Sequence, residues 1–271
     1  MKSTSSATFA GKMALGVVAM GVAVAADAPM PVRHSEGVVH GYLVLSTPAG
    51  VALAHGELLQ NSRNGDVEGR MIFQFKDGSL SDEKTVFTQR DVFTLQSYHQ
   101  IQRGPAFPQD LDFEFARASG FYHLKTKSHS DGSESVDSGK IDLPADLYNG
   151  MVIAISKNIP PGGRATIHML ALAPKPMLIQ LEINPTGDQK VVHGELQEIA
   201  IHYALHPKLG VMTGTFAKVL GRYPPDEHLW MVVKETPGFV KFEGPLYLKG
   251  PVWRIQLAAP CFPSASEPCR G

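Results

Sequence analysis

The sequence is poor in cysteine, in charge and in long hydrophobic runs, and each shortage excludes a class of protein. Its 271 residues include two cysteines, and 19% are charged, with 25 Lys and Arg against 26 Asp and Glu. A chain without a basic excess does not neutralise many nucleic-acid phosphates, and one without an acidic block does not hold cations in bulk. Nucleic acid is therefore not an expected partner.

One uncharged run, Met13–Val24, follows the positive residues Lys2 and Lys12. Twelve apolar residues rise about 18 Å as a helix, short of the roughly 30 Å hydrocarbon core of a bilayer. The run ends at Ala23-Val24-Ala25, whose small residues suit a signal peptidase. We predict that residues 1–25 are a signal peptide and that the mature protein is periplasmic or secreted, with no transmembrane span. No cysteine near the cut offers a site for a lipid anchor.

Both cysteines, Cys261 and Cys269, lie in the last eleven residues. An oxidising compartment favours a disulfide between them, worth roughly 2–3 kcal/mol for so short a loop. A pair of metal-binding thiolates or a redox pair are the alternatives. We predict one domain over residues 26–258 and a disulfide-bonded tail over 259–271.

Along the rest of the chain the hydrophobic period is two, which predicts half-buried strands. The clearest alternating segments are Met71–Phe75, Leu111–Phe115, Ile179–Ile183 and Trp253–Leu257. Turn residues separate such segments at Pro48–Gly50, Asn64–Gly65, Lys76–Gly78, Ser119–Gly120, Asp131–Gly132 and Pro185–Gly187. The predicted fold is mainly β, an antiparallel meander forming a curled sheet, barrel or sandwich with one packed helix.

That helix is predicted over Pro144–Asn158. Leu147, Met151 and Ile155 recur every four residues on one face, and Pro144 suits a first helical position. Gly150 lowers the stability of this helix by about 1 kcal/mol relative to alanine, so the helix must be stabilised by packing against the sheet. A shorter helical turn is expected near residues 215–220.

Motifs of the common enzyme classes are missing. The chain has no nucleophile elbow, phosphate-binding loop, dinucleotide-binding glycine motif or His-Glu-x-x-His zinc motif. Catalysis by residues far apart in sequence stays open. The balance favours a protein that is not an enzyme and has no cofactor.

Eleven histidines are the main candidates for chemistry. His202 and His206 fit a strand, where they lie about 13 Å apart, too far for one metal, so hydrogen-bonded positions on its polar face are expected. His99 shares the phase of apolar neighbours and is predicted to be a core histidine. His34, His40 and His55 would converge only through the fold.

Three carboxylates, Asp110, Asp112 and Glu114, share one strand face at about 7 Å spacing. They fit a solvated face, with a calcium edge or an acid/base pair as alternatives. The segment Gly244–Arg254 fits a hairpin with aromatic anchors, either for core packing or as a ligand platform.

Four blocks carry a resemblance: Val32–Leu43, Leu143–Met151, Ala173–Pro176 and Gly244–Arg254. They resemble a family of exported bacterial β-rich proteins to which no activity is assigned, so the resemblance implies a fold and no catalytic residues. More distantly, a secreted meander with one helix is similar to half-barrel folds that carry lipoproteins, an analogy of fold alone.

The first functional hypothesis is a non-enzymatic envelope module that binds an apolar or amphipathic ligand such as a lipid in a cavity beneath the helix. Met151, Ile155, Phe113 and Phe115 are the predicted ligand-binding residues. The second is a hydrolase or lyase with a dispersed site of histidines and carboxylates. The third is a structural or partner-binding envelope protein whose exposed sheet edge recruits another chain.

Overall fold

The computed structural model describes residues 23–24, 28–172, 175–193, 196–208, 224–232 and 237–258. The predicted disulfide at Cys261 and Cys269 and the predicted helical turn near residues 215–220 lie outside these residues. The strands are β1 Ala23–Val24, β2 Val39–Ser46, β3 Ala52–Arg63, β4 Asp66–Phe75, β5 Leu80–Gln89, β6 Phe93–Arg103, β7 Gln109–Ala116, β8 Phe121–Ser128, β9 Glu134–Lys140, β10 Arg164–Leu172, β11 Pro176–His193, β12 Leu196–Lys208, β13 Glu227–Val232, β14 Gly238–Gly244 and β15 Trp253–Leu257. The helix of this part of the chain is α1, Val152–Asn158.

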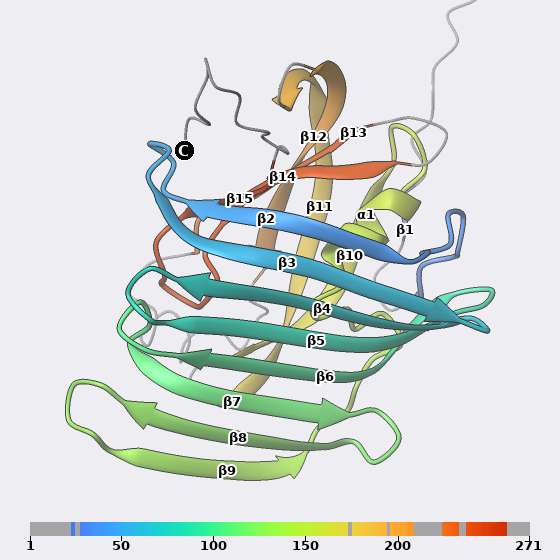
Figure 1. Ribbon diagram of the computed structural model, residues 1–271. Coiled ribbons are helices and arrows are strands. Elements are labelled where there is room, and N and C mark those ends of the chain that lie inside the picture. Colours follow the sequence, from blue (N-terminus) through green and yellow to red (C-terminus); the bar gives the residue numbers. More distant parts are fainter. Residues whose placement is uncertain are drawn as a thin grey trace, which may run out of the picture.

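All strands join one sheet, which confirms the predicted mainly β meander. Its order is β1-β10-β11-β12-β13-β14-β15-β2-β3-β4-β5-β6-β7-β8-β9, and every pair is antiparallel except β1 with β10. Strands β2 to β9 lie side by side as one broad face, and β10 to β12 run behind them (Figure 1). The pairing of β15, the last strand, with β2 joins the C-terminal strands β10 to β15 to the N-terminal strands β2 to β9 in one sheet.

Turn chemistry explains most of the hairpins. Asn64 and Gly65 join β3 to β4 with φ of 55° and 83°, the two positive values that a tight type I′ turn requires. The predicted turn at Pro185–Gly187 is wrong, because this segment lies inside the long strand β11. There the register against β12 shifts between Pro185 and Gly187, so the residues form a bulge.

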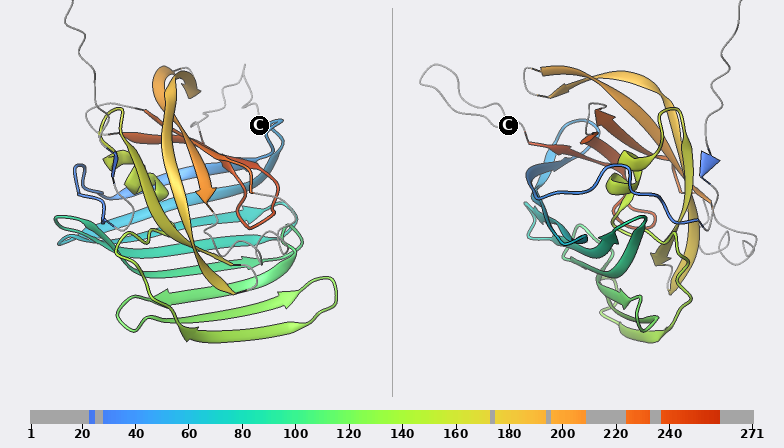
Figure 2. Two further views of the ribbon diagram at one scale, coloured as in Figure 1. Left: turned by 180° about the vertical axis from the view of Figure 1, so that it is seen from behind. Right: turned by 90° about the vertical axis from the view of Figure 1, so that its right-hand side faces the viewer.

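The sheet curls around α1, which lies inside the curl when the molecule is seen from the end (Figure 2). Strand β9 lies at one edge of the sheet and β10 lies next to the short strand β1 at the other edge, and the chain segment between β9 and β10 carries α1. Arg117 anchors this segment, since its guanidinium donates hydrogen bonds to the carbonyl oxygens of Leu143 and Pro144. No helix in the described parts is both long enough and apolar enough to cross a bilayer.

The helix is shorter than predicted. Only Val152–Asn158 is helical, because the preceding residues pair with the edge of β10. Tyr148 N–H donates to the His168 carbonyl, and His168 N–H donates to that of Asp146. Gly150 then turns the chain at φ +70°, a conformation that ends this extended run before the helix.

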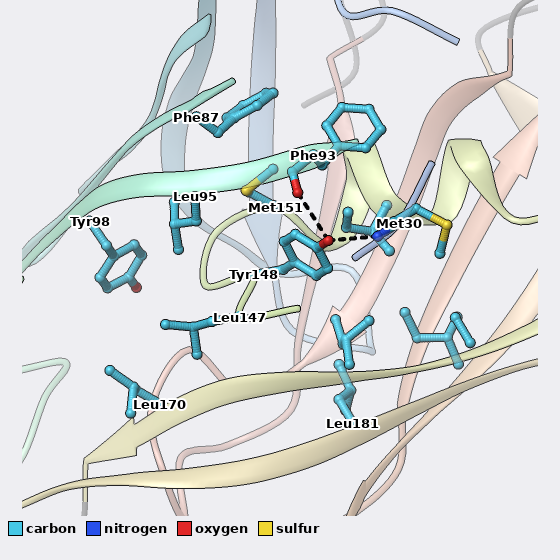
Figure 3. Close-up of a cluster of buried hydrophobic side chains, with 14 of the residues drawn as sticks. Met30, Phe87, Phe93, Leu95, Tyr98, Leu147, Tyr148, Met151, Leu170 and Leu181 are labelled. Atoms are coloured by element: carbon cyan, nitrogen blue, oxygen red, sulfur yellow. Dashed lines mark hydrogen bonds between the residues drawn. The ribbon is translucent and has the colours of Figure 1, made fainter. Parts of the chain in front are cut away.

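The apolar face predicted for this segment is nevertheless correct. Leu147, Met151 and Ile155 are at most 1% exposed and belong to the main core cluster. Tyr148 sits among them, and its hydroxyl accepts a hydrogen bond from Met30 N–H and donates to the Phe93 carbonyl (Figure 3). Burial raises the pKa of Tyr148 to about 12, so it remains a neutral donor.

A second cluster fills the other end of the curl and settles the two alternatives for Gly244–Arg254 in favour of packing. Trp253 is 5% exposed and packs against Phe75, Phe107 and Tyr247, with ring centroids 5.4–6.2 Å apart. These edge and tilted contacts are the usual geometry of packed aromatic rings. The rings therefore stabilise the core.

The carboxyl group of Glu227 faces inward without a charged partner among the described residues. Glu227 lies on the same face of β13 as the core residues Leu229 and Met231, and its Cγ lies 3.0 Å from where a Cβ on Gly244 would stand. Burial raises its pKa to about 7 from 4.5. Among the described residues no hydrogen bond or ion pair offsets that desolvation.

Replacing Glu227 by Gln is expected to raise the free energy of unfolding by about 1–3 kcal/mol above neutral pH, less than full burial would give because Glu227 keeps some exposure. Because the folded pKa is raised, the carboxyl's contribution to stability is full below pH 4.5 and is lost as pH rises through 7. Urea unfolding across this range checks it, with exposed Glu68→Gln as control. Equal pH dependence in wild type and Glu227→Gln would contradict it.

Candidate functional site

A groove of about 490 Å³ crosses strands β5 to β8. It lies on the outer face of the sheet, opposite the face that packs against α1. The side chains that alternate with the core residues of these strands line it: Lys84, Val86, Ser97, His99, Glu114, Ala116, Phe121 and His123. Strands β5 to β8 occupy the lower half of the broad face in Figure 1.

Two cross-strand rows build this groove, because directly opposed residues on antiparallel neighbours stand side by side. The polar row is Lys84, His99, Glu114 and His123, and Ser138 of β9 continues it. The apolar row is Val86, Ser97, Ala116 and Phe121, and Lys140 of β9 continues it. Small side chains in the middle of the second row, flanked by larger ones, leave the surface hollow.

A bulge in β6 creates the polar row. The register between β5 and β6 shifts at Val86 and Phe87, leaving Gln96 as the extra residue. Leu95 points to the core, but beyond the bulge Tyr98 does so and His99 points outward. The prediction of a core His99 is therefore wrong, since the phase of the alternation changes within the strand.

Hydrogen bonds from outside the groove orient its imidazoles. His99 Nε2 lies 2.8 Å from Asp112 Oδ1, and His123 Nδ1 lies 2.7 Å from Ser138 Oγ. A carboxylate only accepts, so neutral His99 donates from Nε2 and keeps Nδ1 as an acceptor. Glu114, between them, makes no hydrogen bond or ion pair with any other described residue. Its two oxygens are available to a ligand.

Two carboxylates of the acidic strand face of β7, Asp110 and Asp112, are hydrogen bonded within the protein. Asp110 accepts from the backbone N–H of Gly104 at 3.0 Å and lies 2.8 Å from His129 Nε2. The Gly104 bond first, and then His129, lower the pKa of Asp110. Nowhere in the described ranges do three His, Cys, Asp or Glu residues stand together as a metal site would require.

The four predicted ligand-binding residues come together inside the curl. Met151, Ile155, Phe113 and Phe115 are at most 3% exposed and belong to one core cluster. Phe115 also borders the groove, but it is 3% exposed and its ring stacks on Tyr98 in the core. Their binding of a ligand stays a prediction, and in this structure they are core residues.

The strand predicted for His202 and His206 is confirmed as β12, and both are hydrogen bonded. His202 Nε2 lies 3.0 Å from His228 Nδ1, and its ring stacks on Trp230 at 4.4 Å. Burial first, and next His228, lower the pKa of His202. Sequence reasoning missed His228, although its spacing of two from Trp230 places both on one strand face.

The other histidines do not converge. His40 Nε2 lies 3.1 Å from Glu57 on the exposed surface of β2 and β3, and the backbone N–H of His34 donates to Asn158. Within the described residues no hydrogen bond, ion pair or ring contact joins His34, His40 and His55 to one another. A site built from these three is therefore not formed.

Comparisons with known proteins give little. No protein-family model matches the chain, and no curated protein matches it. A crystal structure of a β-barrel-like protein from Brucella abortus, a domain of unknown function named DUF1849, is similar at 9% identity and a TM-score of 0.43. The match covers 82% of this chain and 96% of that one. Any function must be sought in the geometry of the groove.

The groove also contains residues of the types that hydrolases use. Asp112 orients His99 as it would a general base, and Ser97 lies two residues away on the same face. Residues two apart in a strand are about 7 Å apart, and no hydrogen bond links Ser97 to His99 in this part of the structure. A nucleophile in contact with its base is thus missing, whereas open donors and acceptors beside an apolar strip are present.

Proposed function

We propose that this protein is a non-enzymatic binding module of the cell envelope that holds an amphipathic ligand in the groove across β5 to β8. The observation that carries the proposal is the pairing of an apolar row with a polar row in one hollow. Its volume of about 490 Å³ falls within the roughly 300–1,000 Å³ of small-molecule clefts. The signal peptide predicted over residues 1–25 supports the envelope as its place of action.

Exposure also favours this surface. Phe121 is 53% exposed on the apolar row, a large aromatic side chain that a ligand would shield from water. The face beneath α1 is already filled by core residues, so a ligand there would have to displace packed side chains. The outer groove needs no such rearrangement.

Filling the floor of the groove tests the proposal. Ala116 is exposed, so Ala116→Leu is expected to fold normally while occupying the space between Ser97 and Phe121. Binding of tetraethylene glycol monooctyl ether, kept below its critical micelle concentration, should weaken at least about tenfold in calorimetric titration, the loss of about 1.4 kcal/mol.

Tyr42→Ala is the matched control, because Tyr42 is also an exposed aromatic residue, at 62%, but lies on β2 away from the groove. Its affinity for the amphiphile should equal that of wild type. Failure of the wild type to bind, or equal binding by Ala116→Leu, would refute the proposed site.

A further inference from the structure

We infer that the polar part of the groove's ligand is a neutral saccharide, an inference that rests on the proposed function and narrows it. The groove places hydrogen-bonding groups of both kinds along one side and an aromatic ring with small apolar residues along the other. A sugar ring has the complementary form, since hydroxyls surround its rim and C–H groups cover its faces.

Charge is the first reason for a neutral ligand. The charged side chains of the groove are Lys84 and Glu114, which stand in the same cross-strand row with His99 between them. The formal charges of these two lining residues cancel when the imidazoles are neutral, and Lys140 beside Phe121 and Asp112 beside His99 add one charge of each sign. An anionic head group would be repelled by Glu114, and a cationic one by Lys84. Hydroxyl groups can instead donate hydrogen bonds to Glu114 and accept them from Lys84.

Spacing is the second reason. His99, Glu114 and His123 are directly opposed on three adjacent strands, about 4.8 Å from one to the next. Hydrogen bonds to Asp112 and Ser138 fix the orientation of the two imidazole rings, so the rings are ordered before a ligand binds. A row of fixed acceptors and donors suits a ligand that carries several hydroxyls in a fixed arrangement.

The aromatic wall is the third reason. Phe121 closes the apolar row, and Lys140 Nζ lies 5.1 Å from its ring centroid. An aromatic face is electron rich and attracts groups of positive partial charge, which include ammonium groups and the C–H faces of sugars. The small side chain of Ala116, directly opposed to Phe121, leaves the groove open beside that ring.

The test uses the whole mature protein and three neutral disaccharides: maltose, cellobiose and diacetylchitobiose. At least one should bind at millimolar concentration in saturation-transfer NMR and calorimetry, and octyl glucoside should bind more tightly than tetraethylene glycol monooctyl ether. Glu114→Ala should weaken disaccharide binding by about tenfold or more, since a hydrogen bond to a charged group is lost. Phe121→Ala should weaken it as well.

Two control variants distinguish loss of the binding site from a general effect of removing a surface side chain. Asp66→Ala removes an exposed carboxylate outside the groove, and Tyr42→Ala removes an exposed aromatic ring outside it; both should bind as wild type does. Binding of the ether without any disaccharide would overturn the saccharide inference and leave the proposed function standing. If neither the ether nor any of the saccharides binds, both the saccharide inference and the proposed function are overturned. Disaccharide binding unchanged by Glu114→Ala and Phe121→Ala would overturn the inference by placing the sugar elsewhere.

Discussion

Replacing Lys157 by Met is expected to lower the free energy of unfolding by about 3–5 kcal/mol, the cost of leaving a buried charge without its partner. Lys157 Nζ, in the last turn of α1, lies 2.8 Å from Glu36 Oε2, and the two side chains are 16% and 3% exposed. Of the residues that the structure describes, Gln60 alone would then remain hydrogen bonded to that carboxylate, at 3.0 Å.

The same pair fastens the N-terminal segment to the helix and the sheet. The Glu36 backbone exchanges two hydrogen bonds with the Gln89 side chain of β5, and Asn158 Oδ1 accepts from the N–H groups of Arg33 and His34 at 2.7 Å each. Loss of Lys157 should therefore loosen a segment that ties three parts of the fold together.

Lys175→Met is the control for this prediction. Lys175 also pairs with a carboxylate, Asp137, at 3.0 Å, but it is 70% exposed, so solvent screens the pair and its loss should leave the stability nearly unchanged. Urea unfolding measures both variants, and adding Glu36→Gln to Lys157→Met should recover most of the stability. A change below about 1 kcal/mol in Lys157→Met would show that the pair is not a buried interaction.

Ile155→Ala is expected to destabilise the protein by about 2–5 kcal/mol, because it opens a cavity in a packed core. Ile155 is 0% exposed among the residues of the main cluster. If the face beneath α1 instead held a ligand, this truncation would cost little stability and would change binding.

Ile153→Ala supplies the comparison within the same helix. Ile153 is partly exposed and packs only at the margin of the cluster, so the same truncation should cost about half as much or less. Thermal unfolding of the two variants would decide the matter. Equal losses, or a loss under about 1 kcal/mol for Ile155→Ala, would argue against a packed interior.

Local chemistry allowed much of the fold to be predicted. Alternation placed Phe113 and Phe115 in the core, and the Asn64–Gly65 pair specified a hairpin. The helix was predicted too long because propensity ignores the edge of β10, which pairs with the residues around Leu147. Tertiary pairing thus replaced the first turns of the helix, while the period of four still marked the buried face.

The groove could not be read from the sequence because it depends on register between distant strands. His99 and Glu114 face each other only after the bulge at Gln96 reverses the phase of β6, and alternation does not reveal a bulge. Sequence did identify the polar face that holds Glu114. It gave no sign that small residues at Ser97 and Ala116 would line up on adjacent strands as a floor.

The central claim is that a ligand binds on the outer face of β5 to β8 and not beneath α1. Backbone amide NMR of the ¹⁵N-labelled mature protein, titrated with octyl glucoside below its critical micelle concentration, tests it most directly. The account predicts that the largest shift changes fall on Ser97, Ala116 and Phe121. Changes concentrated on Met151 and Ile155 would contradict it and return the ligand to the interior.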